Sequence, residues 1–466
     1  MRLCWTHMVL AVACALALAG CASDAGLAPT AQPTGLPRQH AGEVDSLWWK
    51  RFGDAQLDAL VDDALQHAPD IALAGARIRL AQRQGELAVA QLNPSYAIDA
   101  SAQREEFSAL GYFPPPIGGS VFNLGTVQAD FTWDLDWWGK HRATWRLVAG
   151  ETNAARAEER EARLALSISI ARSYFALQAD SARLATVNGM LQDRQQVLAI
   201  QQERQRAGLE SDRPVRPAQG SIAALERQAQ QLRALIQADR IAIAALAGQP
   251  PARGDAIRVA PLPAVPELPA SLPADRIGLR PDVAMQRAVI EVASAQARLA
   301  RIQFYPDINL SGFAGLQSIG FENLLKSGSE TFAVGPAFHL PIFDQHSLRA
   351  NLGARYAEVD IAVETYNRTV IEAMRQAATA TIRLQSLGRE VQSQQRLVDT
   401  LDGSRSLAEA RYRQGLENDL PVFEANIACQ NARNASIELQ QQRLEAVLDV
   451  VRAMGGWPNQ KSGETR

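Results

Sequence analysis

Strict alternation of apolar and polar residues marks one stretch of the chain, residues 125–136. Apolar side chains occupy every second position there, and threonine, glutamine and aspartate fill the positions between them. The apolar positions are Val127, Ala129, Phe131, Trp133 and Leu135. A period of two over about eleven residues is the length and pattern of a membrane strand with lipid on one face and water on the other. We therefore take these five residues as candidate lipid-facing positions.

Three further segments, residues 95–105, 307–316 and 331–342, have a weaker alternation of the same kind. Loop-like connections join the four segments into two predicted hairpins, at about 95–136 and about 307–342. A small soluble sheet would show the same pattern, so the alternation alone leaves that alternative open. Two hairpins cannot close a barrel, and an open sheet edge is not tolerated in lipid. Strands that cross a membrane here would therefore require several copies of the chain.

A second spacing, with apolar residues at every seventh position, covers the long segment from His141 to Gly208. The row in the first half of the chain is Ile170, Leu177, Leu184, Leu191 and Leu198. The segment contains no proline, and a sustained heptad row favours a coiled-coil-like helix, on the order of 100 Å long at 1.5 Å per residue. A row with the same spacing begins at Leu384 and marks a second long helix. Each long helix precedes a glycine turn and a predicted returning helix, at about 215–246 and 422–454.

The chain repeats itself. Pro69 and Pro281 each open a predicted helix that ends at a second proline 25 residues later, and they stand 212 positions apart. The turn glycines Gly208 and Gly415 stand 207 positions apart. A unit of about 200 residues is too long for a solenoid repeat, so the pattern indicates duplication of a whole fold unit. We expect a first repeat over residues 46–250, a Pro-rich linker over 251–272, a second repeat over 273–458 and a tail over 459–466.

The N-terminus has the features of a secretory signal. A short apolar run, too short for a permanent membrane helix, precedes Ala19, Gly20 and Cys21. Residues 18–21 resemble a bacterial lipobox, which predicts a signal peptide over residues 1–20, covalent lipid on Cys21 and a flexible tether over 21–45. Ala22 at the next position resembles lipoproteins that are sent to the outer membrane. An ordinary cleavage site beside a cysteine is the alternative.

Composition limits the remaining chemistry. Cys4 and Cys14 lie in the predicted signal and Cys21 takes the lipid, so Cys429 alone would remain, as a packed and inert thiol. No intramolecular disulfide or multi-cysteine metal site is then expected. A net charge of −3 gives no electrostatic case for nucleic acid. The sequence has no zinc-ligand spacing and no phosphate-loop, nucleophile-elbow or dinucleotide motif. We therefore expect neither an enzyme nor a cofactor, apart from the lipid.

Three motifs add a family resemblance to these patterns. They are Trp48-Trp49 with Phe52-Gly53-Asp54, the Pro-Asp helix openings at 69–70 and 281–282, and the stretch Tyr412-Arg413-Gln414-Gly415-Leu416-Glu417-Asn418-Asp419. Together with the duplication behind a lipobox, they make the chain resemble the TolC/OprM outer-membrane factors, and in particular the NodT-type efflux lipoproteins. The resemblance covers essentially the whole mature chain.

The resemblance implies an α+β membrane protein. Such proteins are homotrimers in which each protomer gives four strands to a twelve-stranded β-barrel, which a long periplasmic α-helical barrel continues. They lie in the outer membrane of Gram-negative bacteria and dock through a periplasmic adaptor protein onto an inner-membrane pump, here expected to be proton-driven. We expect a passive exit duct for drugs or other small toxic compounds. A duct for type I polypeptide secretion and a lipid-anchored periplasmic coiled-coil scaffold that never crosses the membrane are the alternatives.

The resemblance also implies three gate candidates. In the family, the tunnel closes at its periplasmic tip through acidic rings and a tyrosine before the glycine turn, which correspond here to Glu424 and Tyr412. Carboxylates that converge on an axis repel one another and respond to divalent cations and pH. Asp419 could join them, but it is equally a helix N-cap before a proline, and Glu424 is equally an ordinary helix-start carboxylate. The first copy has Pro214 and Pro217 in this region, so a second acidic ring is not expected.

Overall fold

The computed structural model describes residues 24–35, 45–266 and 274–457, except 112, 340, 342 and 343. The predicted signal peptide, the candidate lipid site Cys21 and the predicted C-terminal tail lie outside the described residues. The chain divides into two compact units, each made of three stretches of sequence. Unit 1 comprises residues 1–33, 77–155 and 285–367, and unit 2 comprises residues 34–76, 156–284 and 368–466.

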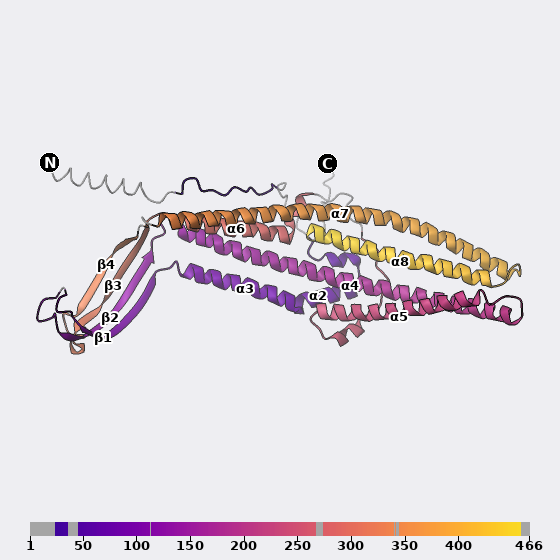
Figure 1. Cartoon of the computed structure of the whole chain (residues 1–466), viewed down its shortest axis with the longest axis horizontal. Coiled ribbons are helices and arrows are strands. Elements are labelled where there is room, and N and C mark those ends of the chain that lie inside the picture. Colours follow the sequence, from indigo (N-terminus) through magenta and orange to yellow (C-terminus); the bar gives the residue numbers. More distant parts are fainter. Residues whose placement is uncertain are drawn as a thin grey trace. The chain divides into compact units, whose positions relative to one another are not determined.

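The order of elements confirms the duplication (Figure 1). The first repeat contains η1 (Trp48–Phe52), α2 (Ala55–His67), α3 (Pro69–Ala90), β1 (Ser95–Glu106), β2 (Val121–Asp134), α4 (Lys140–Arg206) and α5 (Val215–Leu246). The short helices η2 (Pro251–Ala256) and η3 (Ala274–Leu279) follow. The second repeat contains α6 (Pro281–Ile302), β3 (Asp307–Ile319), η4 (Phe321–Asn323), β4 (Glu330–His339), α7 (Gln345–Arg413) and α8 (Leu420–Met454). Helices α3 and α6 both have 22 residues, and α4 and α7 have 67 and 69.

The four strands form one antiparallel sheet in unit 1, in the order β1-β2-β3-β4. Ser95 of β1 lies opposite Thr132 of β2, and Asp307 of β3 lies opposite His339 of β4. Asp307 is 212 positions after Ser95, and His339 is 207 positions after Thr132. These are the two offsets that separate the repeats in the sequence. Both repeats therefore pair their strands in the same register.

Small residues let the helices of unit 1 approach one another closely. Gly85 of α3 faces α4 at a distance that leaves no room for a side chain. A Cβ added at Gly150 of α4 would lie 2.8 Å from Val292 Cγ2 of α6. On α6, a cluster of alanines packs against alanine and valines of α7. The helices therefore follow the order α3, α4, α6, α7, which is also the order of the strands to which they connect.

Residues 24–33 lie along the helices of unit 1, which differs from the flexible tether predicted from their composition. Asp24 forms an ion pair with Arg301 of α6 at 2.5 Å, and Leu27 packs in an apolar cluster between α6 and α7. The carboxylate of Asp360 accepts hydrogen bonds from the backbone N–H and the hydroxyl of Thr30, at 2.8 and 2.9 Å. The composition of the segment could not predict these contacts, because the partners lie on helices far away in the sequence. Arg301 is 277 residues after Asp24, and Asp360 is 330 residues after Thr30.

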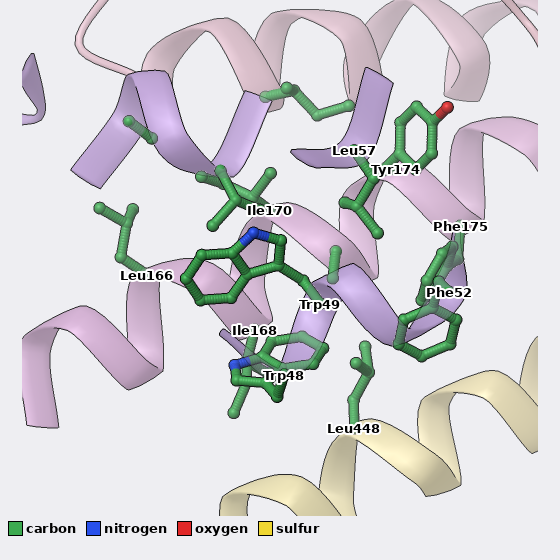
Figure 2. Packing of buried hydrophobic residues seen from close by; sticks show 14 of the residues in the cluster. Trp48, Trp49, Phe52, Leu57, Leu166, Ile168, Ile170, Tyr174, Phe175 and Leu448 are labelled. Atoms are coloured by element: carbon green, nitrogen blue, oxygen red, sulfur yellow. The ribbon is translucent and has the colours of Figure 1, made fainter. Parts of the chain in front are cut away.

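The core of unit 2 surrounds two adjacent tryptophans (Figure 2). Trp48 and Trp49 are 1% and 3% exposed, and they pack among side chains of α2, α4, α5 and α8. Trp48 Nε1 donates a hydrogen bond to Ser167 Oγ at 3.2 Å. Burial of an indole contributes several kcal/mol, so the Trp-Trp motif of the sequence is a central part of this core.

Asp54 fixes the start of α2 beside these tryptophans. Its Oδ1 accepts hydrogen bonds from the backbone N–H groups of Gln56 and Leu57 at 2.9 and 3.1 Å, which is an N-cap. Its Oδ2 accepts a hydrogen bond from the Tyr174 hydroxyl at 2.8 Å. Burial, together with this bond to a carboxylate, raises the pKa of Tyr174. The aspartate of the sequence motif therefore joins α2 to α4.

None of the helices that the structure describes is both long enough and apolar enough to cross a bilayer.

Trp48→Ala should lower the free energy of unfolding by about 3–5 kcal/mol, because it empties a fully buried indole site. Thermal denaturation of the solubilised protein measures the loss. Leu47→Ala is the matched control, since Leu47 is the neighbouring residue and is 46% exposed. Equal melting temperatures for the two variants would contradict the central place of Trp48 in the core.

Candidate functional site

The register places apolar residues of all four strands on one face of the sheet. Residues directly opposite one another in antiparallel strands share a face. One row across the sheet is Tyr96, Phe131, Gly312 and Val334, and the next is Ile98, Ala129, Ala314 and Phe332. The candidates Val127, Ala129, Phe131 and Trp133 all lie on this face, and Leu135 follows the end of β2. Ile98 and Phe332 are both 81% exposed, so the apolar face is uncovered in the single chain.

The opposite face of β2 is polar. Thr126, Gln128, Asp130 and Thr132 alternate with the apolar residues, and Gln128 Nε2 donates hydrogen bonds of 3.0 Å to the Asp130 carboxylate. Their partners on the neighbouring strands include Asp99, Ser101, Ser311 and Gln317. A sheet with one apolar and one polar face suits a boundary between lipid and water.

The outer strands of the sheet are β1 and β4. Within the described residues, each pairs with a strand on one side only. Unpaired backbone N–H and C=O groups cost several kcal/mol each in hydrocarbon. In a membrane, the sheet of one chain is therefore incomplete.

The turns between the long and the returning helices have the same geometry in both repeats. Gly208 and Gly415 have φ angles of 70° and 72°, a conformation that glycine adopts readily and other residues rarely. In each turn, the arginine four residues before the glycine pairs with the glutamate two residues after it, at 3.2 Å. The residues that follow the glycines, Leu209 and Leu416, are 75% and 66% exposed. Each turn therefore presents one apolar side chain beside an ion pair.

All three gate candidates lie at or just after the second turn. Tyr412 is about half exposed, and its carbonyl accepts the N–H of Gly415 at 2.9 Å. Asp419 stands at the N-cap position of α8, but its side chain makes no capping hydrogen bond. Asn418 Oδ1 instead accepts a hydrogen bond of 3.1 Å from the backbone N–H of Leu420, the first residue of α8. Glu424 is exposed near the start of α8. The carboxylate of Asp419 is therefore not engaged in a capping bond to the first turn of α8.

Sequence reasoning missed a pair of acidic side chains in unit 2. Asp180 of α4 is 7% exposed and accepts a hydrogen bond from Arg183 at 3.3 Å. Burial and the nearby Asp180 charge raise the pKa of Asp239 on α5 to about 6. Burial also raises the pKa of Asp180, and Arg183 partly offsets that effect. The sequence signal for Asp239 was weak, because one aspartate in a helix is usually solvated.

A cavity of about 680 Å³ lies in unit 1, where the strands meet the helices. Trp137, Trp138 and Tyr305 contribute to its lining. Trp138 stacks on Tyr305 at 4.7 Å between ring centroids and donates a hydrogen bond from Nε1 to the Pro306 carbonyl at 2.7 Å. Aromatic residues at the ends of strands are typical of the interfacial girdle of membrane strands.

Comparisons with known proteins agree with this geometry. The family model described as outer membrane efflux protein matches residues 60–249 and 272–456, one stretch in each repeat. The chain is 30% identical over 425 residues to the multidrug resistance outer membrane protein MdtP of Escherichia coli K12, which covers 89% of this chain and 87% of that protein. It is 30% identical over 474 residues to the multidrug resistance outer membrane protein MdtQ of Escherichia coli O157:H7, covering 96% and 98%. The crystal structure of the outer membrane protein VceC from Vibrio cholerae matches with a TM-score of 0.80 at 32% identity, covering 89% of this chain and 100% of that one.

A duplicated fold with a two-faced sheet and long helices defines the class, an outer-membrane channel protein. The chain belongs to the outer membrane efflux protein family. The resemblance drawn from the sequence motifs is thereby confirmed, as are the outer-membrane location and the prediction that the protein is an efflux channel and not an enzyme.

Ala129→Arg should destabilise the protein in the membrane by about 2–4 kcal/mol, because it puts a charge on the apolar face of the sheet, which we expect to meet lipid. Thr132→Arg is the matched control, since Thr132 lies on the opposite face of the same strand. The yield of folded protein in purified outer membranes measures the effect. Equal yields for the two variants would contradict the assignment of the faces.

Asp239→Asn should stabilise the protein above pH 6. The folded chain holds the pKa of Asp239 near 6 against an ordinary 3.8, so the folded state binds more protons between these values. Stability therefore falls as pH rises through this window, and the asparagine removes the penalty. We expect a gain of about 1 kcal/mol at pH 7.5, because solvent screens part of the effect on a half-buried group.

Thermal denaturation of both proteins at pH 7.5 and at about pH 2.5, well below both pKa values, tests this dependence. The gain should disappear at the lower pH, where the aspartate is protonated in both states. Asp399→Asn, at an exposed position on α7, serves as the control. A gain that is the same at both pH values would show that the charge of Asp239 is not its cause.

Proposed function

We propose that this chain is the exit duct of a tripartite efflux system and passively passes compounds that an inner-membrane pump delivers through a periplasmic adaptor protein. The observation that carries the proposal is the division of the sheet into an apolar face and a polar face. Each strand of this sheet connects to one of the helices α3, α4, α6 and α7. The strands supply a wall against lipid, and the helices continue the hydrated lining into the periplasm.

The functional assembly is a homotrimer with a twelve-stranded barrel. The open edges of β1 and β4 support this, because strand pairing between copies would satisfy both. Twelve strands enclose more space than the side-chain-filled interior of an eight-stranded barrel and less than a sixteen-stranded porin. A periplasmic scaffold that never enters the membrane would leave the apolar face in water, which argues against that alternative.

The cargo consists of drugs or other small toxic compounds. The relatives MdtP and MdtQ are named multidrug resistance proteins, and they share about three residues in ten with this chain. The pump must supply the energy, because the sequence carries no nucleotide-binding motif. We expect the partner pump to be proton-driven.

A lipid on Cys21 fits the same arrangement. Cys21 stands three residues before Asp24, whose ion pair with Arg301 holds the segment near the end of α6. Three residues span about 10 Å of chain. Strand β3 begins six residues after Arg301, so the lipid would enter the membrane close to the sheet.

The gate is formed by Tyr412, Asp419 and Glu424. Two observations support this role: Glu424 is exposed, and the carboxylate of Asp419 makes no capping hydrogen bond. Both carboxylates are therefore available to approach the equivalent carboxylates of the other copies around the trimer axis. Repulsion among such carboxylates would make the closed state sensitive to divalent cations and to pH.

The function is tested by retention of a fluorescent, drug-like dye in cells that lack this gene and their other exit ducts. Restoring the gene should lower dye retention several-fold, because an energised pump then has a path across the outer membrane. A control strain that carries the gene without the pump should retain dye as the deleted strain does. Unchanged retention, although the protein reaches the outer membrane, would contradict drug efflux and favour export of polypeptides.

Glu424→Ala combined with Tyr412→Phe should loosen the closed tip and raise uptake of large antibiotics that the outer membrane normally excludes. The minimal inhibitory concentration of such an antibiotic should fall at least fourfold. Glu390→Ala, which removes an exposed carboxylate elsewhere on α7, is the control. If uptake is unchanged at normal protein levels, these residues do not form the gate.

A further inference from the structure

The cavity of about 680 Å³ in unit 1 has the size and the walls of a small-molecule site. Such sites have volumes of roughly 300–1,000 Å³ and combine apolar or aromatic walls with a few polar groups. Two other cavities, of about 310 and 360 Å³ in unit 2, have arginines and no aromatic residue in their lining. The cavity of unit 1 differs from both, because Trp137, Trp138 and Tyr305 line it.

One aromatic wall of this cavity is already held in place. The rings of Trp138 and Tyr305 stack with their centroids 4.7 Å apart and their planes at 18° to one another. The hydrogen bond from Trp138 Nε1 to the Pro306 carbonyl, at 2.7 Å, fixes the indole further. Trp137 is 66% exposed, so its ring is accessible. Indole faces attract cations as well as flat apolar molecules.

The charged groups of the lining are mostly acidic. Four aspartates and one lysine line the cavity, and the lysine is already paired, with Lys140 Nζ 2.6 Å from Asp134 Oδ2. Asp136 accepts a backbone N–H of α4 at 3.1 Å. Among the described residues, Asp307 and Asp344 form no ion pair with any basic side chain. A neutral side-chain amide on β3 donates to Asp307 at 3.3 Å, which leaves the charge of that carboxylate uncompensated.

The carboxylates from the strands lie on the polar face of the sheet. Asp134 stands two positions after Thr132 on β2, and side chains two positions apart share a face. Asp307 lies opposite His339, which also lines the cavity. Asn309, two positions after Asp307, lies opposite Asp134. In the proposed duct, this face borders the hydrated interior, so a compound that passes through the interior can reach the cavity.

We propose that this cavity binds organic cations that carry an aromatic ring system. The proposal rests on the exit duct proposed above and adds a class of cargo to it. The ring system of the cargo packs against Trp137 and Trp138, and its positive charge lies beside Asp307 and Asp344. Binding is weak, because a duct that held its cargo tightly would not release it.

The aromatic residues have a simpler role as the alternative. Aromatic side chains at the ends of membrane strands form a girdle against the lipid headgroups. A girdle requires no carboxylates beside the rings and binds no soluble ligand. A binding measurement therefore distinguishes the two roles.

Fluorescence anisotropy of rhodamine 6G, titrated with the purified full-length protein in a non-ionic detergent, tests the site. Binding should saturate at one dye per chain, because all the lining residues come from one chain. Fluorescein, an anionic dye with the same xanthene ring system, should bind at least tenfold more weakly. Higher salt should weaken the binding of rhodamine 6G, since ions screen the attraction between the dye and the carboxylates.

The combination of Asp307→Asn and Asp344→Asn should weaken the binding of rhodamine 6G at least tenfold, because the amides keep the shape and remove the charge. Asp99→Asn is the matched control, since Asp99 lies on the polar face of β1 and does not line the cavity. Asp344→Asn alone, at an exposed position, should weaken binding about threefold and tests the site even if the double variant does not fold. Trp137→Ala should weaken the binding of rhodamine 6G more than Trp137→Phe does, because phenylalanine keeps an aromatic face.

Equal binding of the two dyes, or unchanged binding in both Asp344→Asn and the double variant, would overturn the site. The duct is judged separately, by dye retention in cells that carry the wild-type gene. If the wild-type gene lowers retention and the site fails, the duct stands and the aromatic residues form only a girdle. If the wild-type gene does not lower retention and the purified protein binds neither dye, both proposals are wrong.

Discussion

A strand in a bilayer must pair all its backbone groups and turn only apolar side chains to the lipid, and most of this structure follows from that constraint. The single chain satisfies it in part. Its four strands are paired in one register, and that register collects the apolar residues on one face. The two outer strands remain unpaired on their outer sides. The requirement for further copies is a consequence of these open edges, whereas the helices follow the order of the strands to which the chain connects them.

Elements with a strong period were predictable from the sequence. The alternation from Val127 to Leu135 gave the position of β2 and the face of each residue, because a side-chain period of two leaves only one assignment. The heptad row that begins at Ile170 predicted α4. In the second half of that helix, however, the buried side chains also include Val187, Met190 and Val197, which are not in the row. The duplication could be recognised in the sequence because prolines and glycines mark the ends of the helices and the turns in both repeats. The backbone conformations of these two residue types restrict where they can occur.

Features that depend on distant partners were not predictable. The order of residues 24–33 comes from Asp360 and Arg301, and the raised pKa of Asp239 comes from burial beside Asp180 on another helix. The role of Asp54 depends in part on a hydroxyl from Tyr174, which is 120 residues away. For Asp419, the sequence left two roles open, a helix N-cap and a gate residue. In the structure, its side chain makes no capping hydrogen bond. None of these contacts leaves a period in the sequence.

The central claim is that the sheet separates lipid from a hydrated interior, and cysteine accessibility along β2 tests it most directly. Single cysteines at positions 126 to 132 would be treated with a membrane-impermeant thiol reagent in intact outer membranes. The account predicts strict alternation, with reaction at the positions of Thr126, Gln128, Asp130 and Thr132 and protection at Val127, Ala129 and Phe131. Uniform reaction at all seven positions would contradict it, because both faces of the strand would then be in water.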